Sequence, residues 1–123
     1  MNIIIDTHIF LYALVSPEKI ESHKRNRLES RTNTIYVSSV SVAEIMIKTS
    51  LGKLDFPFDP VEMIERSGFE ELDFSSPAAC LLRTLPFHHR DPFDRMLISQ
   101  ALYHDYMLMS DDEKIAAYDC TVI

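Results

Sequence analysis

Glycine is scarce in this sequence, which has only Gly52 and Gly68 among its 123 residues. Loops that cradle nucleotide phosphates are rich in glycine, so the scarcity argues against a nucleotide-binding enzyme of that kind. Cysteine is scarce as well. Cys80 and Cys120 stand far apart and form no C-x-x-C pair, so we interpret both as reduced, structural thiols.

The sequence also lacks a long apolar run and an excess of positive charge. Residues 1–6 carry no basic leader, and their apolar run is too short for a signal peptide or a membrane span. We therefore expect a cytoplasmic protein that has no contact with a membrane. A formal net charge of −7 argues against binding nucleic acid by positive charge alone. Basic stretches at residues 23–27 and 88–90 could help locally, but such runs are usually solvated surface.

What the sequence does contain is an alternation of strand-like and helix-like segments. Its 46% hydrophobic and 25% charged residues are typical of one globular domain, here residues 1–123. The expected strands lie at about residues 3–5, 35–38, 70–74 and 106–109, with an edge strand at about 120–123. The expected helices lie at about residues 7–14, 18–29, 40–51, 60–67, 77–83, 92–104 and 110–117. This alternation predicts an α/β fold around a parallel sheet.

Acidic residues stand at several junctions between these elements. Asp6 follows the first strand, Glu44 lies in the first turns after the second, and Asp112 follows the strand at residues 106–109. Asp94 lies in the opening turn of the long helix. Ligands of open parallel sheets bind beyond the carboxyl ends of the strands, so we expect these four carboxylates to converge at one rim.

Most of these acids also have a purely structural interpretation. Residues 41–44 and 110–113 fit capping boxes, and Asp91 before Pro92 fits an N-cap better than a metal ligand. Asp6 is harder to explain in this way, because it ends an apolar strand where a lone carboxylate would be partly desolvated. Converging carboxylates repel one another, and a divalent cation relieves the repulsion. Oxygen ligands suit Mg²⁺ or Mn²⁺ better than zinc.

Four segments in this order resemble the PIN domains of VapC-type toxins: residues 3–7, residues 41–45 with Lys48 and 52–54, residues 89–98, and residues 108–112. The resemblance covers nearly the whole chain. It implies a three-layer α/β/α sandwich with a central parallel sheet of four to five strands, and RNA cleavage that requires Mg²⁺ or Mn²⁺. By this resemblance Asp6, Glu44 and Asp94 match the three core acids and Asp112 the more variable fourth, with Asp111 as an alternative ligand.

Four further residues near these acids have two interpretations each. The hydroxyls of Thr7 and Ser110 either bind metal-bound water or phosphate, or cap helices. The cations of Lys48 and Arg95 either neutralise substrate charge or lie on solvated helix faces. In the expected reaction, metal-bound water attacks phosphorus in line and leaves a 3′-hydroxyl and a 5′-phosphate.

Other functions fit the sequence less well. Histidine-based ribonuclease chemistry lacks a second histidine or lysine to assist residues 88–89, which we interpret as surface residues. A phosphoacceptor receiver domain would use Asp73 as its acceptor, yet Thr7 and His8 follow Asp6 where paired acids are usual. A non-catalytic PIN-like binding module stays open, because acids can persist after activity is lost.

The resemblance also implies two partners besides the RNA substrate. One is a second copy of the chain in a homodimer. The other is a cognate antitoxin that inhibits the toxin. An acidic pocket attracts cations, so we expect a basic, partly disordered antitoxin that places an arginine there.

Overall fold

The computed structural model describes residues 1–123 and contains a parallel sheet with the strand order β3-β2-β1-β4. The strands are β1 (Asn2–Ile5), β2 (Thr34–Ser38), β3 (Glu70–Leu72) and β4 (Met107–Met109). In the middle of the sheet, Ile3 of β1 pairs with Ile35 of β2 and with Met107 of β4. Ile3, Ile4 and Ile5 are fully buried, since helices cover both faces of a central parallel strand.

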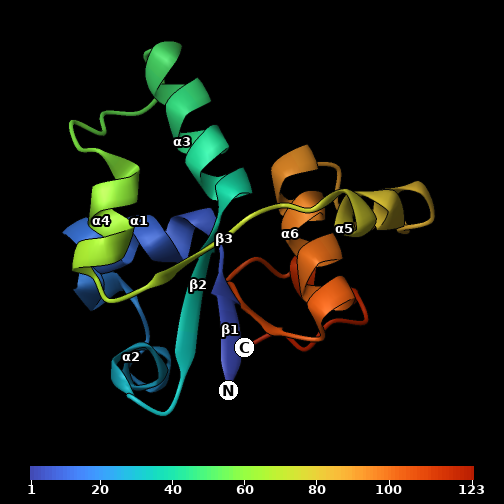
Figure 1. Ribbon diagram of the computed structural model, residues 1–123, viewed down its shortest axis with the longest axis horizontal. Coiled ribbons are helices and arrows are strands. Elements are labelled where there is room, and N and C mark those ends of the chain that lie inside the picture. The colour runs from blue at the N-terminus through green and yellow to red at the C-terminus, as the bar shows by residue number, and fades with distance from the viewer.

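Helices on both faces of the sheet produce three layers (Figure 1). The α-helices are α1 (Thr7–Val15), α2 (Ser22–Glu29), α3 (Ser39–Ser50), α4 (Pro60–Arg66), α5 (Ser76–Cys80) and α6 (Pro92–His104), and the 3₁₀-helices are η1 (Pro17–Lys19), η2 (Leu81–Arg83) and η3 (Ile115–Ala117). In Figure 1, α1, α2 and α4 lie on one side of the strands and α5 and α6 on the other. One buried cluster joins Ile3 to Phe10 of α1, and a second joins Ile4 to Leu97 of α6. The predicted three-layer α/β/α fold with a central parallel sheet is confirmed.

Two helices begin directly after strands, so their first turns lie at the carboxyl edge of the sheet. Asp6 separates β1 from α1 and caps the helix, because its carboxylate accepts the amide hydrogen of Ile9 at 2.8 Å. Of the two interpretations of Thr7, the one as a helix cap is therefore wrong. Ser38 ends β2 and caps α3 by accepting the amide hydrogen of Val40 at 3.0 Å. Residues 41–44 consequently form no capping box.

The long helix α6 begins as the sequence predicts. Asp91 is its N-cap and accepts the amide hydrogens of Phe93 and Asp94 at 2.8 and 3.3 Å, with Pro92 in the first turn. The cap fixes where the side chain of Asp94 leaves the helix.

Three expected helices take a different form. The helix expected at residues 77–83 divides into α5 and η2. The segment expected at residues 18–29 divides into η1 and α2, because Ile20 is extended and its side chain is buried in the core. The helix expected at residues 110–117 is reduced to η3. There the Ser110 hydroxyl accepts the amide hydrogen of Asp112, and the Asp112 carboxylate accepts that of Lys114, which makes a turn.

The C-terminal segment lies beside β4, where the sequence predicts an edge strand. It forms one parallel bridge, between Leu108 and Val122. None of the helices combines the length and the apolar character needed to cross a membrane.

Candidate metal centre

Asp6 is almost completely buried at the end of β1, with 4% of its surface exposed. Its backbone amide donates to the carbonyl of Met109, which ties the residue to the end of β4. Burial raises the pKa of the Asp6 carboxyl, although hydrogen bonds from the Ser110 side chain and the Ile9 amide oppose the rise. At this end of the sheet an ionised carboxylate without a partner is therefore unfavourable.

Glu44 enters the same rim from the second turn of α3 and is also 4% exposed. The Thr7 hydroxyl donates to its Oε1 at 2.8 Å, and the Lys48 ammonium, one helical turn along α3, donates to its Oε2. Thr7 Oγ1 also lies 2.9 Å from the hydroxyl oxygen of the buried Ser41. The hydrogen bond to Glu44 raises the pKa of Lys48. Thr7 and Lys48 thus orient Glu44.

Asp94 joins these acids from the first turn of α6. Burial, and after it the negative charges of Asp91, Asp6 and Glu44, together raise the pKa of its carboxyl to about 6. The charges of Asp6 and Glu44 act on Asp94, so the structure places these three carboxylates near one another. The structure thus brings the core acids toward one rim, while their role as metal ligands stays a prediction.

Asp112 reaches this rim through His89. The Nε2 atom of His89 lies 2.9 Å from Oδ2 of Asp112, to which it is hydrogen-bonded, and 2.9 Å from Oδ2 of Asp94. Burial tends to raise the pKa of Asp112, but the Lys114 amide and the His89 ring outweigh it and lower the pKa. His89 is only 8% exposed, so its interpretation as a surface residue is wrong.

Arg95 does not face the acids, which corrects both of its sequence interpretations. Its side chain is 7% exposed and donates to the carbonyls of Leu85, Pro86 and His89. It also donates to the hydroxyl of Tyr118. Arg95 therefore anchors the segment before α6 and is neither solvated nor available to substrate.

Asp111 lies beside the centre but has its own counter-ion. Lys24 of α2 donates to Oδ1 of Asp111 and, at 3.2 Å, to the carbonyl of Ser110. Only 9% of the Lys24 side chain is exposed, against 46% for Asp111. The interpretation of residues 23–27 as a solvated surface is thus wrong at Lys24, whose partners are more than eighty positions away in the chain.

The donor atoms gathered here suit a hard divalent cation. Carboxylates of Asp6, Glu44 and Asp94 lie near one another at this rim, and Lys48 is in direct contact with Glu44. Burial is the main cause of the raised pKa of Asp94, and the neighbouring carboxylates add to it, so a cation here would relieve their repulsion. Carboxylate oxygens in excess are the ligands that Mg²⁺ and Mn²⁺ prefer. One nitrogen and two oxygens of His89, Asp94 and Asp112 also lie within 4.8 Å of one another.

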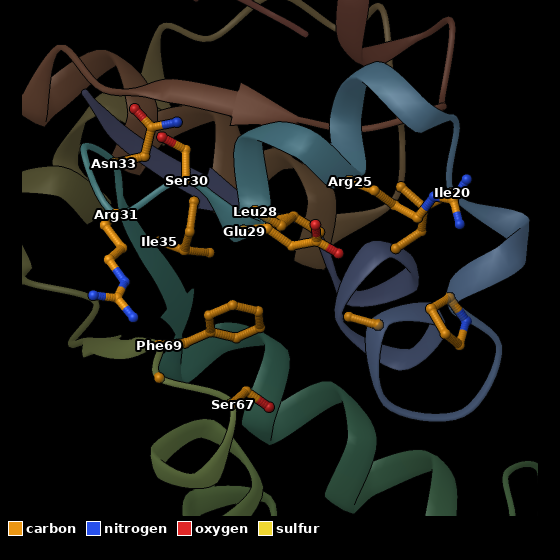
Figure 2. A pocket seen from close by; sticks show the side chains of 13 residues that line it. Ile20, Arg25, Leu28, Glu29, Ser30, Arg31, Asn33, Ile35, Ser67 and Phe69 are labelled. Atoms are coloured by element: carbon orange, nitrogen blue, oxygen red, sulfur yellow. The ribbon is translucent and has the colours of Figure 1, made fainter.

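Two surface cavities differ in whether an acid of this centre lines them. A cavity of about 210 Å³ lies beside Glu44, and its walls include Thr7, Lys48 and Lys53. A larger cavity, of about 650 Å³, lies between α1, α2 and the turn after α4 and contains none of the acids (Figure 2). In that cavity Leu28 and Phe69 face each other, with Arg31 at the rim (Figure 2). Among the acids of the centre, Glu44 alone lines the smaller, lysine-lined cavity.

Comparisons with known proteins agree with this architecture. VapBC2 of Rickettsia felis, in a complex with a promoter DNA fragment, has a similar chain at 21% identity, with a TM-score of 0.73 over 99% of this chain and 96% of that one. VapBC of Salmonella typhimurium bound to DNA gives 16% identity and a TM-score of 0.74 over 100% and 97% of the two chains. VapBC-5 of Mycobacterium tuberculosis gives 16% identity and a TM-score of 0.60 over 99% of this chain and 95% of that one.

These structures share the fold of this chain. No curated protein sequence matches it. The family model described as the PIN domain matches residues 3–119, which include every acid of the candidate centre. The chain therefore belongs to the PIN domain family.

Proposed function

We propose that this PIN domain is a cytoplasmic endoribonuclease that depends on Mg²⁺ or Mn²⁺ and is the toxin of a toxin–antitoxin pair. Asp6, Glu44 and Asp94 would hold the cation, with Asp112 beside them. The observation that carries the proposal is the gathering of Asp6, Glu44 and Asp94 at one rim, where Asp6 and Glu44 are each 4% exposed and their charges add to the effect of burial on the pKa of Asp94. The similar VapBC structures and the PIN family support the nuclease and toxin assignments.

The chain's own residues prepare this centre for a phosphodiester. A bound divalent cation supplies a Lewis acid that activates water and stabilises charge on phosphate oxygens. Thr7 fixes the rotamer of Glu44 by its hydrogen bond, and Lys48 balances part of the charge of Glu44. Lys53 and Lys48 line the adjoining cavity, where they can attract the phosphate backbone of RNA. Local positive charge of this kind offsets the net charge of −7.

Cleavage of total cellular RNA tests the proposal. The wild-type protein should cut RNA with Mg²⁺ or Mn²⁺ and lose this activity in EDTA. Replacing Asp6 by Asn should lower the rate by about a hundredfold or more, because an anchoring charge is lost. Asp119→Asn, at an exposed site outside the centre, is the matched control and should retain the wild-type rate. Full activity in EDTA would contradict a metal-dependent mechanism, and inactivity with both metals would indicate a non-catalytic module.

The proposed antitoxin is a basic, partly disordered protein that places an arginine among the acids. The excess negative charge at Asp6, Glu44 and Asp94 favours a guanidinium there. The neighbouring gene product of the native operon should co-purify with the chain and inhibit RNA cleavage. Its failure to bind or inhibit would contradict the toxin assignment but leave the nuclease proposal standing.

We also propose that the chain forms a homodimer. Light scattering on the purified protein should give twice the mass of 14.2 kDa. A monomer mass at micromolar concentration would contradict this part of the proposal.

A further inference from the structure

We propose that His89 is a positioning residue that donates a hydrogen bond from Nε2 to Asp112 and so holds this acid beside Asp94, without itself binding the metal. The inference rests on the proposed function only in taking the acids as the metal ligands. Its physical basis lies in the contacts of the two imidazole nitrogens, which determine where the ring carries its proton.

The first contact is on the Nδ1 side of the ring. The backbone amide of Asp91 donates to Nδ1 of His89 at 3.2 Å. A backbone amide always carries its hydrogen, so Nδ1 must offer a lone pair and cannot itself be protonated. A neutral imidazole carries one proton, and this proton is therefore on Nε2.

The second contact shows what that proton does. Nε2 lies 2.9 Å from Oδ2 of Asp112 with hydrogen-bond geometry, and Oδ2 of Asp94 lies at the same distance. The Nε2–H group thus joins two acids that come from different parts of the chain. Asp112 stands in the turn after β4, and Asp94 stands in α6. Without this donor, two neighbouring carboxylates would repel each other.

The same arrangement argues against His89 as a metal ligand, although its nitrogen lies close to two carboxylate oxygens. A ligand histidine presents a lone pair to the metal and donates its other N–H to a carbonyl or carboxylate. If Nε2 bound a metal, Nδ1 would need the proton and would meet the N–H of Asp91. The acids would therefore hold the cation, and the histidine orients the acids.

A buried network keeps the ring in this orientation. The amide of His89 donates to the hydroxyl of Tyr118 at 3.0 Å, and its carbonyl accepts from Arg95 at 3.3 Å. The Tyr118 hydroxyl in turn donates to the carbonyl of Pro86 at 2.6 Å. Tyr118 and Arg95 thus hold the backbone amide and carbonyl of His89. Both residues act on the centre through His89.

Long-range ¹H–¹⁵N NMR of the side chain tests the proposal directly, with the His89 signals assigned by their loss in His89→Gln. In the metal-free wild type near neutral pH, Nε2 should be protonated and Nδ1 should not, and saturation with Mg²⁺ should leave this pattern unchanged. A proton on Nδ1, or loss of the proton from Nε2 when Mg²⁺ binds, would overturn the proposal. The measurement does not depend on RNA cleavage, so its failure is distinct from failure of the proposed function.

Mn²⁺ affinity measured by calorimetry provides the second readout. His89→Ala should weaken binding by about tenfold, as is usual when a group that orients a ligand is lost. His89→Gln should restore most of the affinity, because its side-chain amide can donate from a position near that of Nε2. His23→Ala, at an exposed site on α2, is the matched control. Equal loss in the Ala and Gln variants would overturn the positioning role.

Discussion

The hydroxyl of Thr7 donates to Oε1 of Glu44 across 2.8 Å, and this bond joins the first turn of α1 to α3. Both residues are buried, so the bond is shielded from water and sets the direction of the Glu44 carboxylate. Residues 7 and 44 come from separate strand–helix units, and the parallel sheet brings these units together.

Thr7→Val should weaken Mn²⁺ binding by about tenfold, because it removes the donor while keeping the shape of the side chain. Thr7→Ser keeps the hydroxyl and should stay close to the wild-type affinity. Calorimetric titration of both variants is the measurement. Equal affinity in Thr7→Val and the wild type would show that this bond does not serve the metal.

Asp94 makes the stability of the metal-free protein depend on pH. Its pKa in the folded state is about 6, above the ordinary value of 3.8, so the folded protein binds this proton more tightly than the unfolded chain does. The contribution of Asp94 to the free energy of unfolding is therefore present at low pH and is lost as the pH rises from about 4 to about 6. Above that range the ionised, buried carboxylate disfavours the folded state.

Asp94→Asn should consequently be more stable than the wild type at about pH 7.5 in EDTA, by on the order of 1 kcal/mol after allowance for solvent screening. At about pH 4.5 the difference should be smaller. Urea unfolding at both pH values is the measurement, with Asp119→Asn as control. A variant that is less stable than the wild type at the higher pH would contradict this account of Asp94.

The sequence allowed the sheet, and the place of Asp6 and Asp94 at the starts of helices, to be predicted because these signals are local. Asp6 ends an unbroken run of isoleucines, and Asp94 follows an N-cap and a proline. The capping residues were harder to assign. Residues 41–44 have the composition of a capping box, but Ser38 lies closer to the true start of α3 and caps it. A sequence pattern of capping residues does not fix which of them the helix uses.

Arg95→Lys should lower the free energy of unfolding by on the order of 2 kcal/mol, because lysine cannot reach the several carbonyls that the guanidinium binds. The KM for RNA should remain unchanged under conditions where the variant is folded. Urea unfolding and steady-state kinetics are the measurements. Unchanged stability together with a raised KM would mean that Arg95 binds substrate instead.

The ion pair of Lys24 and Asp111 should stabilise the folded protein. It should not contribute to metal binding. A double-mutant cycle with Lys24→Met and Asp111→Asn should give a coupling energy of about 1 kcal/mol, because one partner is buried and the other is half-exposed. Asp111→Asn should leave Mn²⁺ affinity close to that of the wild type. A loss as large as that in Asp6→Asn would identify Asp111 as a ligand.

His89 and Lys24 could not be predicted as parts of the site, since their partners are distant in sequence. His89 contacts Asp112, which is 23 positions away, and Lys24 contacts Asp111, which is 87 positions away. In the sequence, the first stands in a loop and the second in a basic run, and both patterns are typical of surface residues. Only the packing of α2 and of the segment before α6 against the end of β4 brings them to the acids.

Anomalous scattering from a crystal soaked in Mn²⁺ would show directly whether the core acids bind a divalent cation. We expect a peak at the rim of the sheet, within about 2.3 Å of carboxylate oxygens of Asp6 and Asp94, and without a bond to Nε2 of His89. A peak bonded to His89, or no peak among these acids at saturating Mn²⁺, would contradict this expectation.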